Sequence, residues 1–287
     1  MTNNDFICFV GGDERQRYAV NHLAEYININ AVGEVFCSVK HSRVSYFENP
    51  NKAIYGASAI ILPVPASTSE SVVAFSDIAE IISKAPKKVY VLGGKFSPYL
   101  KGLIEKYDIK YDDYYDNECF TLKNAYLTAE GAVQLAMTAL KGAIRFSKCA
   151  ILGYGRIGKA LGNMLKSLHA DVTVFARKEE ALALATENGL KTQNISSISN
   201  ALTEDFDIIF NTVPERILHN EALLSLPSRT VLIELASAPG GLDPDIAAQC
   251  DVQFINGRGI PGKYAPETAG KIASDTIFQY LKKEGIL

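Results

Sequence analysis

The chain has 287 residues, and 47% of them are hydrophobic, which is enough for two ordinary hydrophobic cores. Its 32 acidic and 29 basic residues nearly balance, so no overall field favours a nucleic acid or a membrane surface as a partner. The five cysteines are far apart and form no CxxC pair, which argues against a disulfide framework and against a metal site. We therefore expect a cytoplasmic protein of two domains that acts on small molecules.

Short apolar runs alternate with helical stretches in the N-terminal third of the chain. Such alternation predicts a parallel α/β sheet with helices on its faces. The expected strands are 6–10, 34–39, 59–62 and 89–92, and the expected helices are 14–26, 69–83 and 98–105.

A charged, tyrosine-rich stretch at 111–118 interrupts this pattern and is typical of an exposed loop or sheet edge. We expect the domain boundary soon after it, with a substrate domain at 1–122 and a Rossmann domain at 123–287. Apolar spacing predicts two long helices, at 128–145 and 266–283, and both are expected to bridge the domains.

Strand and helix alternation resumes after the first of these long helices. The apolar runs again have the length of buried strands, which indicates a second parallel α/β domain. The expected strands are 149–152, 172–175, 207–211, 231–235 and 252–256.

A glycine-rich turn in this second domain carries the clearest chemical signal. Gly153 permits a sharp exit from the preceding strand, Gly155 lets the backbone approach a pyrophosphate, and Gly158 allows close helix packing. A turn that only closes strand onto helix is the alternative, but it does not require three glycines at these spacings. The turn therefore predicts dinucleotide binding. Its residues are Gly153, Tyr154, Gly155, Arg156, Ile157 and Gly158.

The ends of three further strands bear on the cofactor. Ala176, Arg177 and Lys178 stand where an NAD enzyme usually carries a carboxylate, and the two cations suit the 2′-phosphate of NADP. Arg177 as a solvated charge at a helix start is the alternative. Two other strand ends are expected beside the nicotinamide and its ribose, with ordinary turn chemistry as the alternative. These strand ends are Asn211, Thr212, Val213 and Pro214, and Glu234, Leu235, Ala236 and Ser237, and all of these residues except Glu234 are predicted cofactor contacts.

Several motifs together resemble the family of dipicolinate synthase A subunits. They are TAEGAVQLA at 128–136, the glycine turn at 153–158, Gly240-Gly241, and GIPGKYAPETAG at 259–270. The opening GGDERQ at 11–16 also matches, so the resemblance covers essentially the whole chain. With the strand pattern, it implies two Rossmann-like or flavodoxin-like parallel-sheet domains joined by bridging helices.

The resemblance also implies an activity. Such an enzyme oxidises dihydrodipicolinate to pyridine-2,6-dicarboxylate with NADP, in the mother cell of a sporulating bacterium. It works with a smaller, flavoprotein-like partner, the B subunit of dipicolinate synthase, so a homo- or hetero-oligomer is expected.

A dicarboxylate substrate needs cations and backbone donors from both domains. Arg15 lies near the start of a helix, whose free amides would also favour an anion. Asp13 beside it would repel a phosphate, so a second nucleotide site there is not expected. Lys263 is the candidate for assisting proton transfer, and solvated surface charges are the alternative for each cation. The candidates for substrate binding are Gly12, Arg15, Ser67, Thr68, Lys95, Arg258, Pro261, Gly262 and Thr268.

Alcohol oxidation, the reaction of 2-hydroxyacid dehydrogenases, is disfavoured by the positions of the histidines. It needs a histidine base after the last strands, whereas all four histidines precede Asn256. A dihydropyridine is different, because aromatisation supplies driving force and a modest base or water suffices. Another NADP-dependent 2-hydroxy or keto acid dehydrogenase and a non-catalytic cofactor-binding subunit remain the alternatives.

Overall fold

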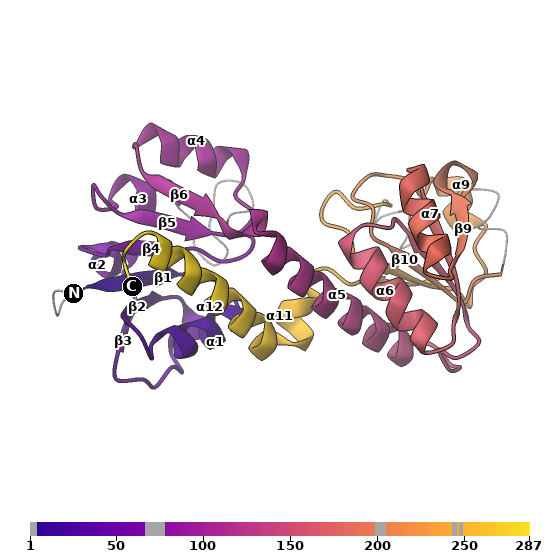
Figure 1. The fold of residues 1–287 in the computed structure, drawn as a ribbon, viewed down its shortest axis with the longest axis horizontal. Coiled ribbons are helices and arrows are strands. Elements are labelled where there is room, and N and C mark those ends of the chain that lie inside the picture. Colours follow the sequence, from indigo (N-terminus) through magenta and orange to yellow (C-terminus); the bar gives the residue numbers. More distant parts are fainter. Residues whose placement is uncertain (1–4, 67–77, 199–204, 243–245, 247–248) are drawn as a thin grey trace. The chain divides into compact units, whose positions relative to one another are not determined.

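The computed structural model describes residues 5–66, 78–198, 205–242, 246 and 249–287. The chain forms two compact units, which are drawn in Figure 1. The first unit is Met1–Asn124 with Ala265–Leu287, and the second is Ala125–Tyr264. In the described part of the chain, no helix combines the length and the apolar character needed to span a membrane.

The first unit contains, in its described residues, a six-stranded parallel sheet of order β3-β2-β1-β4-β5-β6. The order reverses between β1 and β4, and the carboxyl ends of the strands at such a switch point form a crevice. The strands are β1 (Phe6–Val10), β2 (Asn28–Val32), β3 (Val44–Phe47), β4 (Ala59–Ile61), β5 (Tyr90–Gly93) and β6 (Lys110–Asp113).

Helices cover both faces of this first sheet. One apolar core lies under α1 and α12, and the other lies under α2, α3 and α4. The helices are α1 (Glu14–Leu23), α2 (Pro50–Ile54), α3 (Ile78–Ser83), α4 (Pro98–Lys106) and α12 (Pro266–Lys283), with short 3₁₀ turns η1 (Glu34–Phe36) and η2 (Tyr114–Asp116).

The second unit repeats this strand order, β12-β11-β10-β7-β8-β9, and its paired strands are again parallel. Both sheets therefore have the Rossmann order, which confirms the predicted α/β fold class. The strands are β7 (Lys148–Leu152), β8 (Asp171–Ala176), β9 (Lys191–Asn194), β10 (Ile208–Asn211), β11 (Val231–Glu234) and β12 (Gln253–Asn256).

Two cores flank the second sheet as well. One contains side chains of α5, α6, α7 and α11, and the other contains those of α9. The helices are α5 (Glu118–Ala139), which passes from the first unit into the second, α6 (Arg156–Ser167), α7 (Glu179–Glu187), α9 (Asn220–Leu224) and α11 (Ile260–Tyr264), with the 3₁₀ turn η3 (Ile195–Ser197).

Some predicted elements differ from the structure. The strand predicted at 34–39 is wrong, because that segment begins with η1, whose Phe36 is buried, and the strand is β2. Polar asparagines in β2 (NINAV) hide its strand character. The helix predicted at 128–145 starts earlier, at Glu118, because the Asn117 side chain accepts a hydrogen bond from the Phe120 amide at 3.0 Å.

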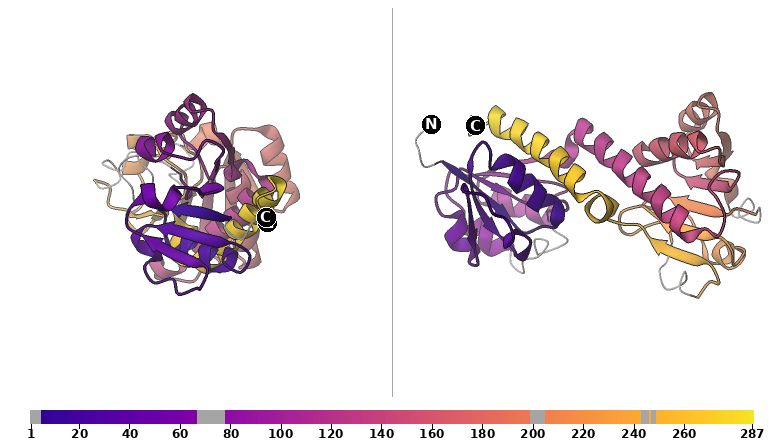
Figure 2. Two further views of the ribbon diagram at one scale, coloured as in Figure 1. Left: turned by 90° about the vertical axis from the view of Figure 1, so that its left-hand side faces the viewer. Right: turned by 90° about the horizontal axis from the view of Figure 1, so that it is seen from below.

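The last helix has the predicted bounds, but it belongs to the first unit rather than to the second domain. Figures 1 and 2 show α12 in yellow beside α1 in indigo. The two helices approach closely at Gly270, where a Cβ atom would lie 2.6 Å from the Arg15 carbonyl oxygen. Ala273 and Ile277 join the core of the first unit, so apolar burial assigns the helix to that unit.

Candidate functional site

The glycine turn follows the buried end of β7. Gly153 has φ +92°, and a Cβ atom there would lie 2.6 Å from Thr212 Oγ1, so the turn requires glycine. At Gly158 a Cβ atom would overlap the Gly153 carbonyl oxygen, because α6 packs directly against the turn. At Gly155 it would meet nothing within 4 Å. Two glycines therefore shape the turn, and the third borders open space.

The N-terminus of α6 starts directly after Gly155. None of the described side chains caps this end, and the first turn carries no acidic residue. The first amides of a helix have no partner within the helix, and the helix dipole adds partial positive charge. This end of α6 therefore favours an anion.

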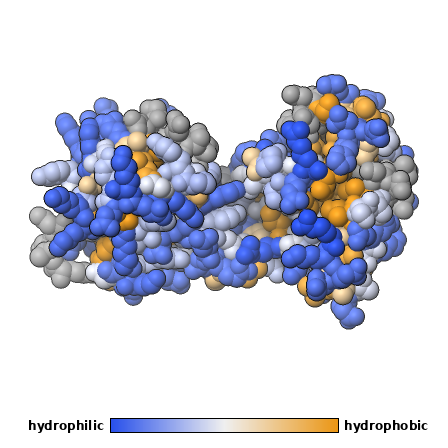
Figure 3. Space-filling model, turned by 90° about the horizontal axis from the view of Figure 1, so that it is seen from above, coloured by the Kyte–Doolittle hydropathy of each residue, from blue (hydrophilic) through white to orange (hydrophobic). Residues whose placement is uncertain are grey.

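A pocket of about 560 Å³ lies at this turn, within the second unit. On the face drawn in Figure 3, hydrophobic residues gather in the second unit, at the right, and hydrophilic ones border them. Such a pocket with a few polar groups suits a cofactor. Of the predicted cofactor residues, the lining includes Gly153, Tyr154, Gly155, Ala176, Arg177, Lys178, Thr212, Val213 and Pro214.

The other predicted cofactor residues lie outside this lining. In the turn itself, Gly158 is buried against the strand. Among the strand-end residues, Asn211 has no exposed surface, and its side chain bonds inside the protein. These residues are Arg156, Ile157, Gly158, Asn211, Leu235, Ala236 and Ser237.

The charges around the pocket are mixed. Arg177, Lys178 and a further cation, Lys159, line it, together with two carboxylates that sequence reasoning missed, Glu180 and Glu215. Arg177 Nη1 lies 3.7 Å from Glu215 Oε2, and both side chains are exposed, so the pair is weak. Glu215 reaches the pocket from the loop after β10, far along the chain from Arg177, and local spacing carries no signal for this contact.

A buried carboxylate organises the loops after β10 and β11. Glu234 ends β11, is only 2% exposed, and pairs in the sheet with Asn211. Its oxygens accept hydrogen bonds from Asn211 Nδ2 and from the amides of Ala236 and Gly241, at 2.8 to 3.0 Å. The sequence places Glu234 at one of the strand ends expected beside the nicotinamide, but the hydrogen bonds that it accepts involve a neighbour from another strand, which local spacing does not predict.

Arg258, a predicted substrate contact, supports the same region. Its Nε donates to the Ala236 carbonyl oxygen at 2.9 Å, and its Nη2 donates to the Pro239 carbonyl oxygen at 3.0 Å. Two of its three guanidinium nitrogens therefore hold the chain's own backbone.

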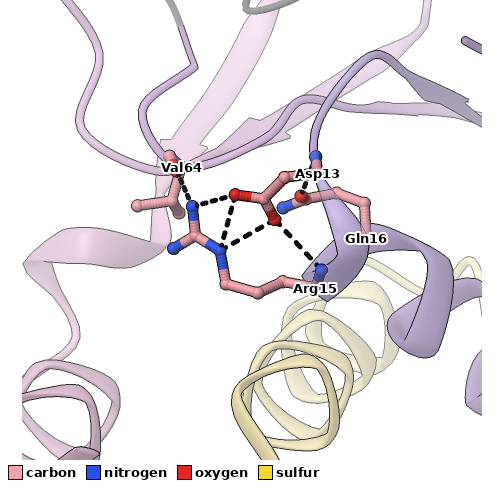
Figure 4. Close-up of polar contacts among 4 residues, drawn as sticks. All are labelled: Asp13, Arg15, Gln16 and Val64. Atoms are coloured by element: carbon pink, nitrogen blue, oxygen red, sulfur yellow. Dashed lines mark hydrogen bonds and ion pairs between the residues drawn. The ribbon is translucent and has the colours of Figure 1, made fainter. Parts of the chain in front are cut away.

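The turn after β1 is closed by its own side chains, as Figure 4 shows. The Asp13 carboxylate accepts from the Arg15 amide at 3.0 Å, and the Gln16 side chain accepts from the Asp13 amide at 3.0 Å. These two bonds form a capping box at the start of α1. At Gly12 a Cβ atom would lie 2.6 Å from the Gln16 side chain, so this glycine makes room for the cap. The Arg15 amide, one of the helix-start amides expected to favour an anion, is thus already bonded.

Arg15 is held at two of its three guanidinium nitrogens. Nη2 donates to Asp13 Oδ2 at 2.7 Å and to the Val64 carbonyl oxygen at 2.5 Å, and Nε donates to both Asp13 oxygens. Burial lowers the pKa of Arg15, but the hydrogen bond and charge of Asp13 outweigh it, so the pKa lies above its ordinary value. In the described part of the chain, Nη1 has no hydrogen-bond partner and stays a donor.

Lys95 and Tyr114 lie in the same unit, after β5 and β6. Lys95 is exposed and has φ +58°, a conformation that is uncommon outside glycine, and its amide donates to Asp113 Oδ1 at 2.7 Å. Tyr114, predicted in an exposed stretch, is fully buried instead, because its ring packs against Phe120. Its hydroxyl has no hydrogen-bond partner among the described residues, and burial raises its pKa.

The motif at 259–270 is divided between the two units, which meet in sequence at Tyr264 and Ala265. Pro261 is buried and Gly262 is half-buried in α11, where the predicted catalytic residue Lys263 is exposed. Thr268 is exposed in the first turn of α12. The other two candidates, Ser67 and Thr68, lie outside the described residues.

Two family models match consecutive parts of the chain. The model for the N-terminal domain of the dipicolinate synthase A subunit matches residues 6–115. The model for the NAD-binding domain of D-isomer-specific 2-hydroxyacid dehydrogenases matches residues 124–248, which include the glycine turn and the pocket. The second unit therefore carries a dehydrogenase domain for a nicotinamide cofactor.

Known proteins match nearly the whole chain. The dipicolinate synthase A subunit of Bacillus subtilis (strain 168) is 31% identical, over 96% of this chain and 95% of that protein. The crystal structure of the Bacillus halodurans A subunit has a TM-score of 0.88 at 28% identity, over 96% of this chain and 98% of that one. The crystal structure of the Bacillus subtilis protein has a TM-score of 0.84 at 28% identity, over 99% and 97%. The chain belongs to the family of dipicolinate synthase A subunits.

Proposed function

We propose that this chain oxidises dihydrodipicolinate to dipicolinate, pyridine-2,6-dicarboxylate, and transfers the hydride to NADP. One observation carries the cofactor half of the proposal. The N-terminus of α6 has no side-chain cap, opens on free space at Gly155, and shares its pocket with Arg177 and Lys178. Membership in the family of dipicolinate synthase A subunits supports dipicolinate as the product.

The residues present fit a nicotinamide dinucleotide. The amides at the start of α6 would hold the pyrophosphate, and Arg177 and Lys178 would hold the 2′-phosphate. Thr212 and Val213, which line the same pocket, would border the nicotinamide half of the cofactor. When bound, the cofactor supplies the hydride acceptor. The protein's own contribution is to position the substrate and to exclude water.

Arg15 is our first candidate for a substrate carboxylate. Asp13 and the Val64 carbonyl hold its guanidinium in one orientation, and Nη1 is left to donate. An arginine fixed in this way loses little side-chain entropy when it binds a carboxylate. Lys95 and Arg258 are further candidates. The remaining proposed contacts are Gly12, Ser67, Thr68, Pro261, Gly262 and Thr268.

The reaction does not require a strong catalytic base. The dihydropyridine ring loses one hydride and one proton, and the aromatic ring that forms supplies the driving force. The proton passes to water, and Lys263, which is exposed in α11, would assist that transfer. We therefore expect Lys263→Ala to lower the rate modestly, and Lys263→Arg to retain most of it.

The proposal includes a flavoprotein-like partner, the B subunit, and a role in sporulation. The test mixes the purified chain with dihydrodipicolinate and NADP, with and without that partner, and follows NADPH by absorbance. Formation of NADPH by the isolated chain would exclude a merely cofactor-binding role. Absence of NADPH in both mixtures, with oxidation of a 2-hydroxy acid instead, would favour the alternative dehydrogenase.

A further inference from the structure

We propose that Glu234 makes the second unit prefer the oxidised over the reduced nicotinamide cofactor. The carboxylate accepts four hydrogen bonds and faces only N–H donors. Oε1 accepts from Asn211 Nδ2 and from the Ala236 amide, both at 2.8 Å. Oε2 accepts from Asn211 Nδ2 at 3.0 Å and from the Gly241 amide at 2.9 Å. A carboxylic acid would turn its own hydrogen against one of these donors, so the arrangement suits the charged form.

The charge of Glu234 is buried and incompletely balanced. In the described part of the chain, no lysine or arginine forms an ion pair with it. Arg258 is the cation across the loop, because a Cβ atom on Gly240 would touch Arg258 Nη2 and lie 3.1 Å from Glu234 Oε2. Glu234 and Arg258 thus hold the loop 236–241 from opposite sides, through its amides and its carbonyls.

The same network reaches the cofactor pocket. Asn211 Oδ1 accepts from the Val213 amide at 3.1 Å, and Asn211 Nδ2 donates to the Val213 carbonyl oxygen at 3.0 Å. Val213 lines the pocket and packs at Gly153. Asn211 therefore links Glu234 to Val213 in the pocket wall. Glu234 itself lies at the carboxyl end of β11, beyond the point where the strand order reverses.

The position of Glu234 decides whether the oxidised or the reduced form of the cofactor binds more tightly. In a Rossmann unit the dinucleotide crosses the carboxyl ends of the strands, and its nicotinamide half lies on the side of β10 and β11. The oxidised ring carries a positive charge, and the reduced ring carries none. A buried carboxylate is weakly screened, so it attracts the oxidised ring over several ångströms. The inference rests on nicotinamide binding by the second unit, and it is independent of the substrate and of the choice between NADP and NAD.

The test measures dissociation constants of the full chain for NADP⁺ and NADPH, by titration calorimetry, in the wild type and in Glu234→Gln. We expect the ratio of the oxidised to the reduced dissociation constant to rise about tenfold, from the loss of one buried negative charge on the nicotinamide side of the sheet. Equal weakening of both forms, or no change in either, would overturn the proposal. If the chain prefers NAD, the same ratio is measured with NAD⁺ and NADH, so a wrong cofactor assignment stays distinguishable.

Two further variants separate charge from loop geometry. Asn211→Ala breaks bonds of the same network but keeps the carboxylate, and it should weaken both forms by similar factors. Arg258→Gln removes the opposing cation, and it should shift the ratio toward the oxidised form. If Glu234→Gln does not fold, as judged by circular dichroism, Arg258→Gln decides, and an unchanged ratio in that variant contradicts the proposal.

Discussion

The turns after β1 and β7 occupy the same place in two sheets of the same strand order, but they differ in how the N-terminus of the following helix is capped. The first is closed by Asp13, which caps α1 and holds Arg15. The second leaves the N-terminus of α6 without a side-chain cap, beside Gly155 and open space. The fold is shared, and the group that satisfies the helix N-terminus decides whether a phosphate can bind.

The largest effect should come from making the second turn resemble the first. Gly155→Asp adds a carboxylate through a Cβ atom that would meet nothing within 4 Å, so we expect a stable fold and nucleotide binding weaker by about a hundredfold. Calorimetric titration with NADP⁺ measures the affinity, and thermal unfolding checks the fold. Gly155→Ala is the matched control, and it should lose much less affinity. Comparable losses in the two variants would show that bulk, not charge, matters at this position.

The next effect concerns the cations at the end of β8. Replacing Arg177 and Lys178 together by alanine should weaken NADP⁺ binding roughly 10- to 100-fold and NAD⁺ binding much less, because only NADP carries the 2′-phosphate. Lys159→Ala is the control, since this cation lines the same pocket from α6. It should affect both cofactors alike. Equal weakening of both cofactors by the double variant contradicts the assignment to NADP.

Opening the first turn should cost stability without creating a nucleotide site. Asp13→Ala removes the cap of α1 and one partner of Arg15, so the free energy of unfolding should fall by about 1 to 2 kcal/mol in urea denaturation. Asp13→Asn keeps a good capping residue and loses only the charge, and it should cost less. Tight NADP⁺ binding at this turn in either variant would break the comparison.

The smallest effect concerns the buried hydroxyl beneath the first turn. Tyr114→Phe removes a hydroxyl that has no partner among the described residues, so the free energy of unfolding should stay unchanged or rise by up to about 1 kcal/mol. Urea denaturation of wild type and variant measures the difference. A clear loss of stability would mean that the hydroxyl is hydrogen-bonded in solution.

Regular elements with strong periodicity were predictable from the sequence, and two of the edge strands, β3 and β9, were not. β1 and α12 have the expected bounds. Edge strand β9 (KTQN) contains no apolar residue, and none of the residues of edge strand β3 (VSYF) is fully buried, because one side of an edge strand has no neighbour and needs less burial. The burial of Tyr114 within a charged stretch likewise depends on Phe120, which follows in α5.

The sequence by itself determined the dinucleotide turn, because the roles of Gly153 and Gly158 depend on local geometry within one strand, turn and helix. Tertiary structure alone decided which unit receives α12, how Arg15 and Arg258 are engaged, that Glu215 lies at the pocket, and which buried hydrogen bonds Glu234 accepts. Each of these outcomes depends on contacts between segments far apart in the chain. Local spacing cannot encode such contacts, since the folding of each sheet brings those segments together.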